Sequence, residues 1–183
     1  LAKTNGPPVI GWIGTHSTFP FLESIFPILE DLAKKHEFIL KIVGSGQESI
    51  SSRNLTIENL PWEMVREVSD FQSFDIGLYP IQLADNAPEE WILGKSGFKA
   101  IQYLSIGIPF VMTPVGVCAD IGVPNETHFS ANNEQEWYNS LEKLILDRSF
   151  RTQMGEIGRQ YSLSNYSLVK QVDELVQIFR GIG

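Results

Sequence analysis

Short apolar runs alternate with segments of helical periodicity along this chain, and this alternation restricts its fold more than any other feature. The runs are rich in β-branched and aromatic residues, which predicts β-strands. Because strands alternating with helices are typical of parallel βαβ units, the pattern predicts an α/β fold. It indicates a doubly wound open sheet of about six parallel strands with helices on both faces. The predicted strands are residues 9–14, 38–44, 55–60, 75–81, 109–115 and 127–130.

The segments between the strands carry apolar residues three and four positions apart, as one face of a helix requires. Glu134 and Glu136 precede one such segment and suit a helix N-terminus, where the helix dipole favours negative charge. Between the first two strands a single helical stripe is predicted through Leu22, Ile25, Phe26, Leu29, Leu32 and Ala33. Further helices are predicted over residues 98–105, 137–145, 148–161 and 168–180.

The length of 183 residues fits one sizeable domain, and no repeat or linker divides the chain, so residues 1–183 are predicted to form a single domain. The 22 acidic and 14 basic residues give a net charge of −8, which argues against a broad surface for nucleic acid. Cys118 is the single cysteine, which excludes an internal disulfide and a cysteine-rich zinc site. The three histidines show no ligand spacing, so no metal site is expected.

Ligands of doubly wound folds bind outside the carboxyl ends of the strands, so the loops that follow the strands are the places to search. The loop at 14–20 joins the first strand to the first helical stripe. Its small residues, among them Gly14, Thr15 and Ser17, offer backbone N–H groups that can hold a phosphate. The alternative is simple capping of the following helix by Ser17 or Thr18.

Gly44 and Gly46 follow the second predicted strand and match two-thirds of a dinucleotide-binding fingerprint. Ser49 occupies the third glycine position, and the strand is not the first, so the match is incomplete. Two interpretations remain open, a tight turn with positive φ and a close approach of the backbone to a ligand.

The sequence Gly-Lys-Ser at 94–96 matches the end of a Walker-type phosphate loop, but Glu89 occupies the place of the first glycine, which excludes an ATPase of that type. Lys95 still places a cation beside the start of a predicted helix, which favours a diphosphate. Lys99 lies one turn after Lys95, and Gln102 three residues further, so one face can present two cations and an amide. The alternative is that both lysines are solvated surface residues.

The loop after the fifth predicted strand contains Gly116, which can form a turn whose backbone N–H groups face a ligand. The alternative for Gly116 is an ordinary exit from the strand. No histidine stands at a recognisable sequence spacing from Cys118. Cys118 is therefore interpreted as a small buried hydrophobic residue and not as a nucleophile.

Five stretches, in this order and spacing, carry a resemblance to a known family: residues 10–18, 40–46, 74–80, 94–109 and 113–116. The chain resembles the C-terminal half of a GT-B-fold glycosyltransferase of the retaining family 4, also called group 1. The resemblance runs from about Val9 to the last predicted helix. It implies a Rossmann-like domain that binds a nucleoside-diphosphate sugar, the donor, while a separate and here missing N-terminal half binds the acceptor.

The resemblance implies a hexosyl- or N-acetylhexosaminyltransferase of polysaccharide or cell-envelope biosynthesis, with a UDP-sugar as an example of the donor. It implies a cytoplasmic location, with any membrane contact made through the missing half. No cofactor and no metal are expected besides the donor substrate. The isolated domain is expected to bind the donor but to turn over little, because the acceptor site is absent.

Carried over position by position, the resemblance implies that the loop with Gly14, Thr15 and Ser17 lies against the donor diphosphate. It also implies that Gly44 and Gly46 lie near the nucleoside. The chain departs from the common pattern after the first strand, because most members carry an arginine where this chain has Thr15.

The segment 94–102 is implied to lie beside the phosphates, the sugar and the ribose. Lys95 is then the catalytic cation, and Lys99, Gln102 and Gly116 are substrate-binding residues. Most members carry two glutamates eight positions apart, where this chain has Gly94 and Gln102.

The departure leaves open which carboxylate orients the sugar, and the candidates are Asp85, Glu89 and Glu90. The absent glutamate pair also supports a second hypothesis, a degenerate and non-catalytic nucleotide-binding module on the same fold. A third hypothesis is one half of a nucleotide-sugar epimerase.

Overall fold

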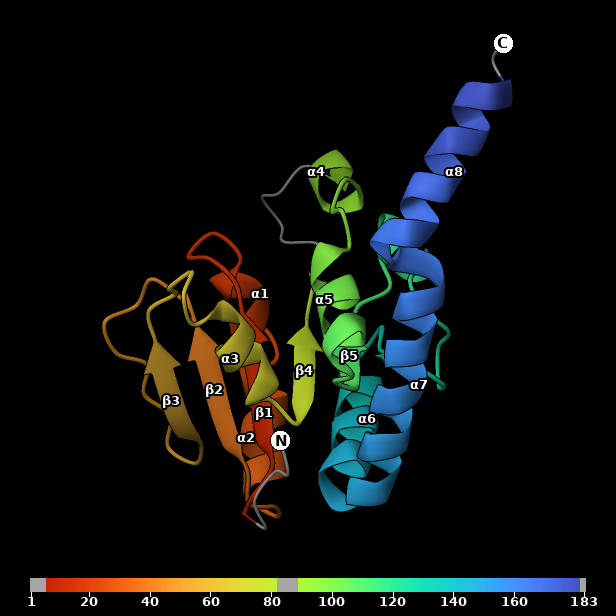
Figure 1. The fold of residues 1–183 in the computed structure, drawn as a ribbon. Helices are drawn as coiled ribbons and strands as arrows, with labels where there is room; N and C mark the ends of the chain where they lie inside the picture. Colours follow the sequence, from red (N-terminus) through yellow and green to blue (C-terminus); the bar gives the residue numbers. More distant parts are fainter. Residues whose placement is uncertain (1–5, 82–88, 182–183) are drawn as a thin grey trace.

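The computed structural model describes residues 6–81 and 89–181, and within them the strands form one parallel sheet in the order β3-β2-β1-β4-β5-β6 (Figure 1). Each strand falls inside one of the six predicted runs, and helices cover both faces, so the predicted α/β, doubly wound fold is confirmed. The strands are β1 (Val9–Ile13), β2 (Ile39–Val43), β3 (Thr56–Leu60), β4 (Ile76–Tyr79), β5 (Phe110–Met112) and β6 (Phe129–Ser130).

The strand order reverses at β1, which pairs with β2 on one side and with β4 on the other. In this register Ile10 lies opposite Leu40 of β2 and Ile76 of β4. The chain therefore builds the sheet outward from β1 to β3, and then in the other direction from β4 to β6. Such a reversal opens a crevice at the carboxyl ends of the two central strands, because the loops that follow them diverge to opposite faces.

The first face of the sheet is covered by α1 (Phe19–Glu23), α2 (Phe26–Ala33) and α6 (Glu134–Leu146). Side chains of these helices pack in one cluster with alternate residues of the strands, such as Ile10 and Trp12. This alternation is the period of two that a pleated strand imposes. The helix dipole interpretation at Glu134 and Glu136 holds, since α6 begins there and Asn133 caps it.

The single helix predicted between the first two strands is wrong, because α1 ends at Glu23 and α2 begins at Phe26. Pro27 lies in the first turn of α2, where a missing N–H costs nothing. A proline also disfavours helical backbone in the residue before it, so the helix cannot run through this position without distortion. The apolar spacing continues across the break, which is why periodicity alone did not show it.

The second face carries α3 (Glu67–Gln72), α5 (Phe98–Ile106) and α7 (Arg148–Tyr166). Its core is aromatic, with ring centroids 5.5 Å apart for Phe71 and Tyr103 and 5.4 Å apart for Tyr103 and Phe110. The hydroxyl of the fully buried Tyr103 donates to the carbonyl oxygen of Leu78 over 3.0 Å. This bond fixes α5 against β4, and so fixes the direction in which the first turn of α5 points.

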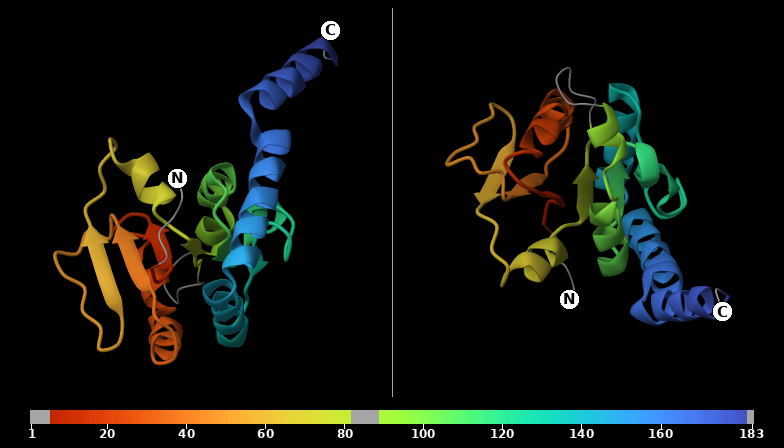
Figure 2. Two further views of the ribbon diagram at one scale, coloured as in Figure 1. Left: turned by 60° about the horizontal axis from the view of Figure 1, so that its bottom comes forward. Right: turned by 90° about the horizontal axis from the view of Figure 1, so that it is seen from above.

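Three further elements complete the described residues: α4 (Glu89–Leu93), the 3₁₀-helix η1 (Gly116–Asp120) and α8 (Leu168–Gly181). The helix predicted over 148–161 continues to Tyr166 as α7. Figures 1 and 2 show α8 projecting away from the sheet, and none of its side chains is buried. Within 6–81 and 89–181, no helix combines the length and the apolar character that a membrane span needs.

Candidate functional site

Two adjoining cavities lie where the loops after β1, β2 and β4 meet the start of α5. Both are lined by Ile13, Gly14, Thr15, Phe98 and Lys99, so they form one continuous cleft, here called the β1 cleft. The β4-side cavity has a volume of about 230 Å³ and is also lined by Trp12, Thr18, Phe21, Tyr79, Pro80, Ile81, Lys95 and Ser96. The β2-side cavity has a volume of about 590 Å³ and is also lined by His16, Gly44, Gly46, Pro61, Trp62, Glu67 and Gln102.

The loop after β1 closes a turn with its own hydroxyl groups. The N–H of Thr15 donates to Oγ1 of Thr18 over 3.0 Å, and the hydroxyls of Thr15 and Ser17 lie 2.9 Å apart. Thr18 stands at the N-cap of α1 but makes no side-chain cap bond, so simple capping does not account for the loop. Among the described residues, the N–H groups of His16 and Ser17 have no hydrogen-bond partner. His16 lines the β2-side cavity and Ser17 lines neither cavity, so a contact of these N–H groups with an anion stays a prediction.

Gly44 and Gly46 adopt positive φ angles of 80° and 75°, which confirms the predicted tight turn. The turn packs directly on the loop after β1, because a Cβ at Gly44 would lie 2.4 Å from the carbonyl oxygen of Gly14. A Cβ at Gly46 would lie 2.8 Å from Cβ of His16. Both glycines line the β2-side cavity, and contact with a ligand there stays a prediction.

Lys95 and Lys99 both reach the β4-side cavity, as the sequence pattern predicted. Lys95 precedes α5, its Nζ lies 5.5 Å from the centroid of the Phe21 ring, and burial lowers its pKa. Lys99 lies in the first turn of α5, with Nζ 5.3 Å from the centroid of the Phe71 ring, and burial lowers its pKa to about 8. Neither lysine is fully exposed, so neither is a freely solvated surface residue, and a contact of either with a ligand stays a prediction.

Gln102 lines the β2-side cavity one turn after Lys99 and donates from Nε2 to Oε1 of Glu67 over 3.0 Å. The indole N–H of Trp62 donates to Oε2 of the same carboxylate over 2.9 Å. Sequence reasoning missed Trp62 and Glu67, because the loop after the third strand was not among those searched. That loop lies at the same carboxyl edge of the sheet as the loops that were searched, and this position is the signal that could have identified both residues.

Gly116 does not line either cavity of the β1 cleft. Gly116 has a φ of 53° and begins η1, where a Cβ would lie 2.4 Å from the carbonyl oxygen of Leu93. The glycine thus lets η1 pack on α4, and its contact with a substrate stays a prediction. Of the three candidate carboxylates, Asp85 and the side chain of Glu89 lie outside the described residues. Glu90 is exposed and does not line the cleft.

Cys118 is fully buried near the β4-side cavity, which confirms its interpretation as a small buried hydrophobic residue. It packs with Phe21, Ile81 and Ile92. Burial raises the pKa of its thiol, which disfavours the thiolate that a nucleophile requires.

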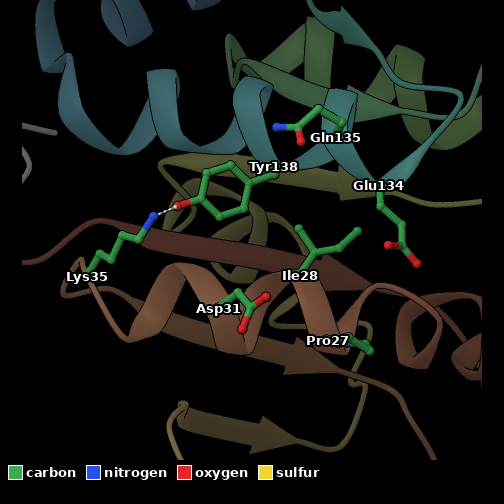
Figure 3. Close-up of a pocket in the computed structure, with 7 residues that line it drawn as sticks. All are labelled: Pro27, Ile28, Asp31, Lys35, Glu134, Gln135 and Tyr138. Carbon is green, nitrogen blue, oxygen red and sulfur yellow. Dashed lines mark hydrogen bonds between the residues drawn. The ribbon is translucent and has the colours of Figure 1, made fainter.

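A separate cavity lies between α2 and α6 and holds none of the predicted site residues (Figure 3). Lys35 lies at one end of it and donates from Nζ to the hydroxyl of Tyr138 over 2.9 Å. Next to Lys35, Nε2 of His36 lies 3.0 Å from Oε1 of Glu142. These contacts join the end of α2 to α6, so the side chains here have a structural role.

No family model and no curated protein sequence matches the chain. Solved structures match its fold throughout. A glycosyltransferase from Rickettsia africae ESF-5 matches 98% of this chain with a TM-score of 0.74 and 16% identity. Anabaena Alr3699/HepE, in complex with UDP and glucose, matches 92% with a TM-score of 0.64 and 14% identity. The C-terminal domain of a glycosyl transferase group 1 family protein (LpcC) from Francisella tularensis matches 89% with a TM-score of 0.61 and 15% identity.

The share of each solved protein that is matched differs. This chain spans 48% of the Rickettsia protein and 48% of HepE, but 88% of the isolated LpcC domain. At these identities the likeness concerns the fold. In its fold, this chain corresponds to the Rossmann-like C-terminal half of GT-B glycosyltransferases.

Proposed function

We propose that this chain is the donor-binding half of a retaining glycosyltransferase, which transfers a hexosyl or N-acetylhexosaminyl group from a nucleoside-diphosphate sugar to a glycan or lipid-linked acceptor. The observation that carries the proposal is the convergence of Lys95 and Lys99 on the β1 cleft of a domain with a net charge of −8. In such an acidic domain, a cation pair at the switch point of the sheet selects an anionic ligand there. The fold of HepE, which was solved with UDP and glucose, supports the same class of ligand.

In the proposed reaction, the bond between the anomeric carbon and the phosphate oxygen breaks, and its electron pair goes to the diphosphate. An acceptor hydroxyl attacks from the same face of the sugar, and its proton passes to the departing phosphate oxygen. Lys95 and Lys99 are in place before the step begins, and their positive charges offset the negative charge that develops on the diphosphate. The proposal therefore places the charge compensation on the protein and requires no metal ion. The acceptor site belongs to a separate half of the longer protein.

A second candidate function, a nucleotide-binding module without transferase activity, is favoured by Gly94 and Gln102 at the places of the family's glutamates. Both candidates predict nucleotide binding by this domain. An assay of sugar transfer by the longer parent protein separates them, because only the first predicts turnover.

Nucleotide binding is tested by thermal unfolding with uridine, guanosine and adenosine diphosphates. At a nucleotide concentration about 100 times Kd, binding adds about 2.7 kcal/mol to the free energy of unfolding. For a domain of this size, that raises Tm by roughly 5–10 °C. Lys95→Ala should abolish the rise, whereas Lys170→Ala on the exposed α8 should retain it. If no nucleotide shifts Tm of the unmodified chain, the donor-site proposal is wrong.

A further inference from the structure

A cavity at the opposite edge of the sheet from the β1 cleft gathers half of the arginines of the chain. It is lined by Asp75 and Pro109, which directly precede β4 and β5, and so lies at the amino ends of the strands (Figure 1). Its volume is about 360 Å³. Three of the six arginines of the chain line it, namely Arg148, Arg151 and Arg159. In a domain with a net charge of −8, this concentration of cations favours an anionic ligand here.

The three arginines lie on one face of α7. Positions 148, 151, 155 and 159 are three or four residues apart, as a single helix face requires. Gly155 brings this face against the turn after α5, because a Cβ there would lie 2.1 Å from the carbonyl oxygen of Gly107. The cavity thus has a closely packed wall, and the arginines stand on both sides of the contact along the helix.

Two of the guanidinium groups are held in place by backbone carbonyl groups. Nη1 of Arg151 donates to the carbonyl oxygens of Leu144 and Ile145 in the last turn of α6. Nη1 of Arg159 donates to the carbonyl oxygen of Ser105 in the last turn of α5, over 2.7 Å. A guanidinium has five N–H donors, and Nε and Nη2 of both groups donate no hydrogen bond among the described residues. Each group therefore offers donors in a fixed orientation, which suits the binding of a phosphate.

The two ends of the cavity differ in charge. At one end, Arg148 and Arg151 lie one turn apart, and the charges of Arg148 and of the single carboxylate Asp75 both act on Arg151. Burial lowers the pKa of Arg151, so its charge has lost part of its hydration and gains from an anion. At the other end, Arg159 follows Glu156 by one turn, so one cation stands against one carboxylate. The surplus of positive charge lies at the end with Arg148 and Arg151.

Between these two ends, the wall offers hydrogen-bond acceptors. The hydroxyl of Thr152 donates to the carbonyl oxygen of Arg148 over 3.0 Å, so its acceptor capacity remains. Glu156 follows one turn later, is exposed and also lines the cavity, and an ionised carboxylate only accepts hydrogen bonds. Acceptors beside a place for a phosphate call for hydroxyl donors on the same ligand.

We propose that this cavity binds a small phosphomonoester that also carries hydroxyl groups. Arg148 and Arg151 bind its phosphate, and Thr152 and Glu156 accept hydrogen bonds from its hydroxyls. Pockets for small ligands have volumes from about 300 Å³ upward, so the cavity suits a ligand of this size. The site lies at the other edge of the sheet from the β1 cleft, and the proposal does not depend on nucleotide binding there.

Calorimetric titration of the chain with glycerol 3-phosphate, inorganic phosphate and glycerol tests the proposal. Glycerol 3-phosphate should bind about tenfold more tightly than inorganic phosphate, because its hydroxyls add a hydrogen bond to a charged acceptor. Glycerol alone should not bind. Arg148→Gln should weaken glycerol 3-phosphate about tenfold, since a charged donor to the phosphate is lost. Arg180→Gln, a matched change on the exposed α8, should leave the affinity unchanged.

Three further variants separate the roles of the residues. Asp75→Asn should tighten both phosphate probes by about threefold, because it removes a negative charge beside the phosphate. The amide keeps an acceptor for the N–H of Val9, which donates to Oδ2 of Asp75 over 2.9 Å. Glu156→Gln should reduce the preference for glycerol 3-phosphate to about twofold or less. Lys95→Ala, in the β1 cleft, should not change the affinity for either probe.

The inference is overturned if neither phosphate probe binds, or if Arg148→Gln and Asp75→Asn leave the affinity unchanged. It is also overturned if both probes bind equally, because the acceptors then have no role. Loss of binding in Lys95→Ala would overturn it as well, since the probes would then occupy the β1 cleft. A gain in affinity cannot come from unfolding, so Asp75→Asn keeps the test valid even where Arg148→Gln lowers Tm. In each of these results the proposed function stands.

Discussion

Nζ of Lys41 lies 3.2 Å from Oδ1 of Asp70, inside the packing between β2 and α3. The two side chains are 11% and 6% exposed, so the pair is largely shielded from water. Removing Asp70 leaves the buried Lys41 with only the more distant and half-exposed carboxylate of Glu58, 3.6 Å from Nζ. Asp70→Leu is therefore expected to lower the free energy of unfolding by about 3–5 kcal/mol, measured by urea denaturation.

The contribution of the ion pair to the free energy of unfolding can be separated from that of the packing around it. The double variant Lys41→Met, Asp70→Leu removes both charges and should recover most of the lost stability. Asp31→Leu, at the exposed Asp31–Lys34 pair, should leave the free energy of unfolding nearly unchanged. Equal losses for Asp70→Leu and Asp31→Leu would show that the buried pair contributes no more to the free energy of unfolding than the exposed pair does.

Lys99 is expected to make ligand binding depend on pH. Burial lowers its pKa to about 8, so the ammonium loses its proton as pH rises through 8. Above that pH the cleft presents one cation fewer, and pyrophosphate affinity should fall about tenfold between pH 7 and pH 9. Lys99→Arg should reduce this decline, because a guanidinium stays charged over the whole range. Calorimetric titration checks both statements, and an identical decline in both proteins would contradict them.

Much of the fold could be predicted because the sheet is parallel and buried. Most strands are then short, largely apolar runs that stand out from their flanks, whereas the edge strand β3 (TIENL) mixes polar and apolar residues, and all six predicted runs contain a strand. The break between α1 and α2 was not predicted, because the apolar spacing continues across it and only Pro27 marks it. The short helices α3 and α4 also escaped, since five or six residues are too few to establish a period.

Some features of the candidate site could likewise be predicted from the sequence, and others could not. That Lys95 and Lys99 lie close together could be predicted, because glycines and a helix start lie beside them in the sequence, and both line the β4-side cavity. The contact between Glu67 and Gln102 joins residues 35 positions apart, and it depends on how α3 packs against α5. Trp62 and Glu67 lie in a segment without glycine or a cation pair, so no local pattern distinguished them from an ordinary surface loop.

The turn at Gly44 is expected to tolerate no side chain. Its φ of 80° alone makes Gly44→Ala cost about 1–2 kcal/mol of unfolding free energy. The new Cβ would also lie 2.4 Å from the carbonyl oxygen of Gly14, which must then move within the β1 cleft. The variant should lose both stability and nucleotide affinity in thermal unfolding. Gly181→Ala, where a Cβ meets nothing within 4 Å, should lose neither.

Helix α8 is expected to contribute little to the stability of the domain. Its apolar side chains are open to solvent, with Leu168 79%, Val169 73% and Phe179 67% exposed. Ending the chain after residue 167 should change the free energy of unfolding by only about 0.5 kcal/mol, as for other surface changes. It should also reduce the binding of a hydrophobic dye, because an exposed apolar patch is removed. By comparison, Leu104→Ala in the fully buried core should cost about 2–5 kcal/mol. A truncation as costly as Leu104→Ala would mean that α8 packs on the domain in solution.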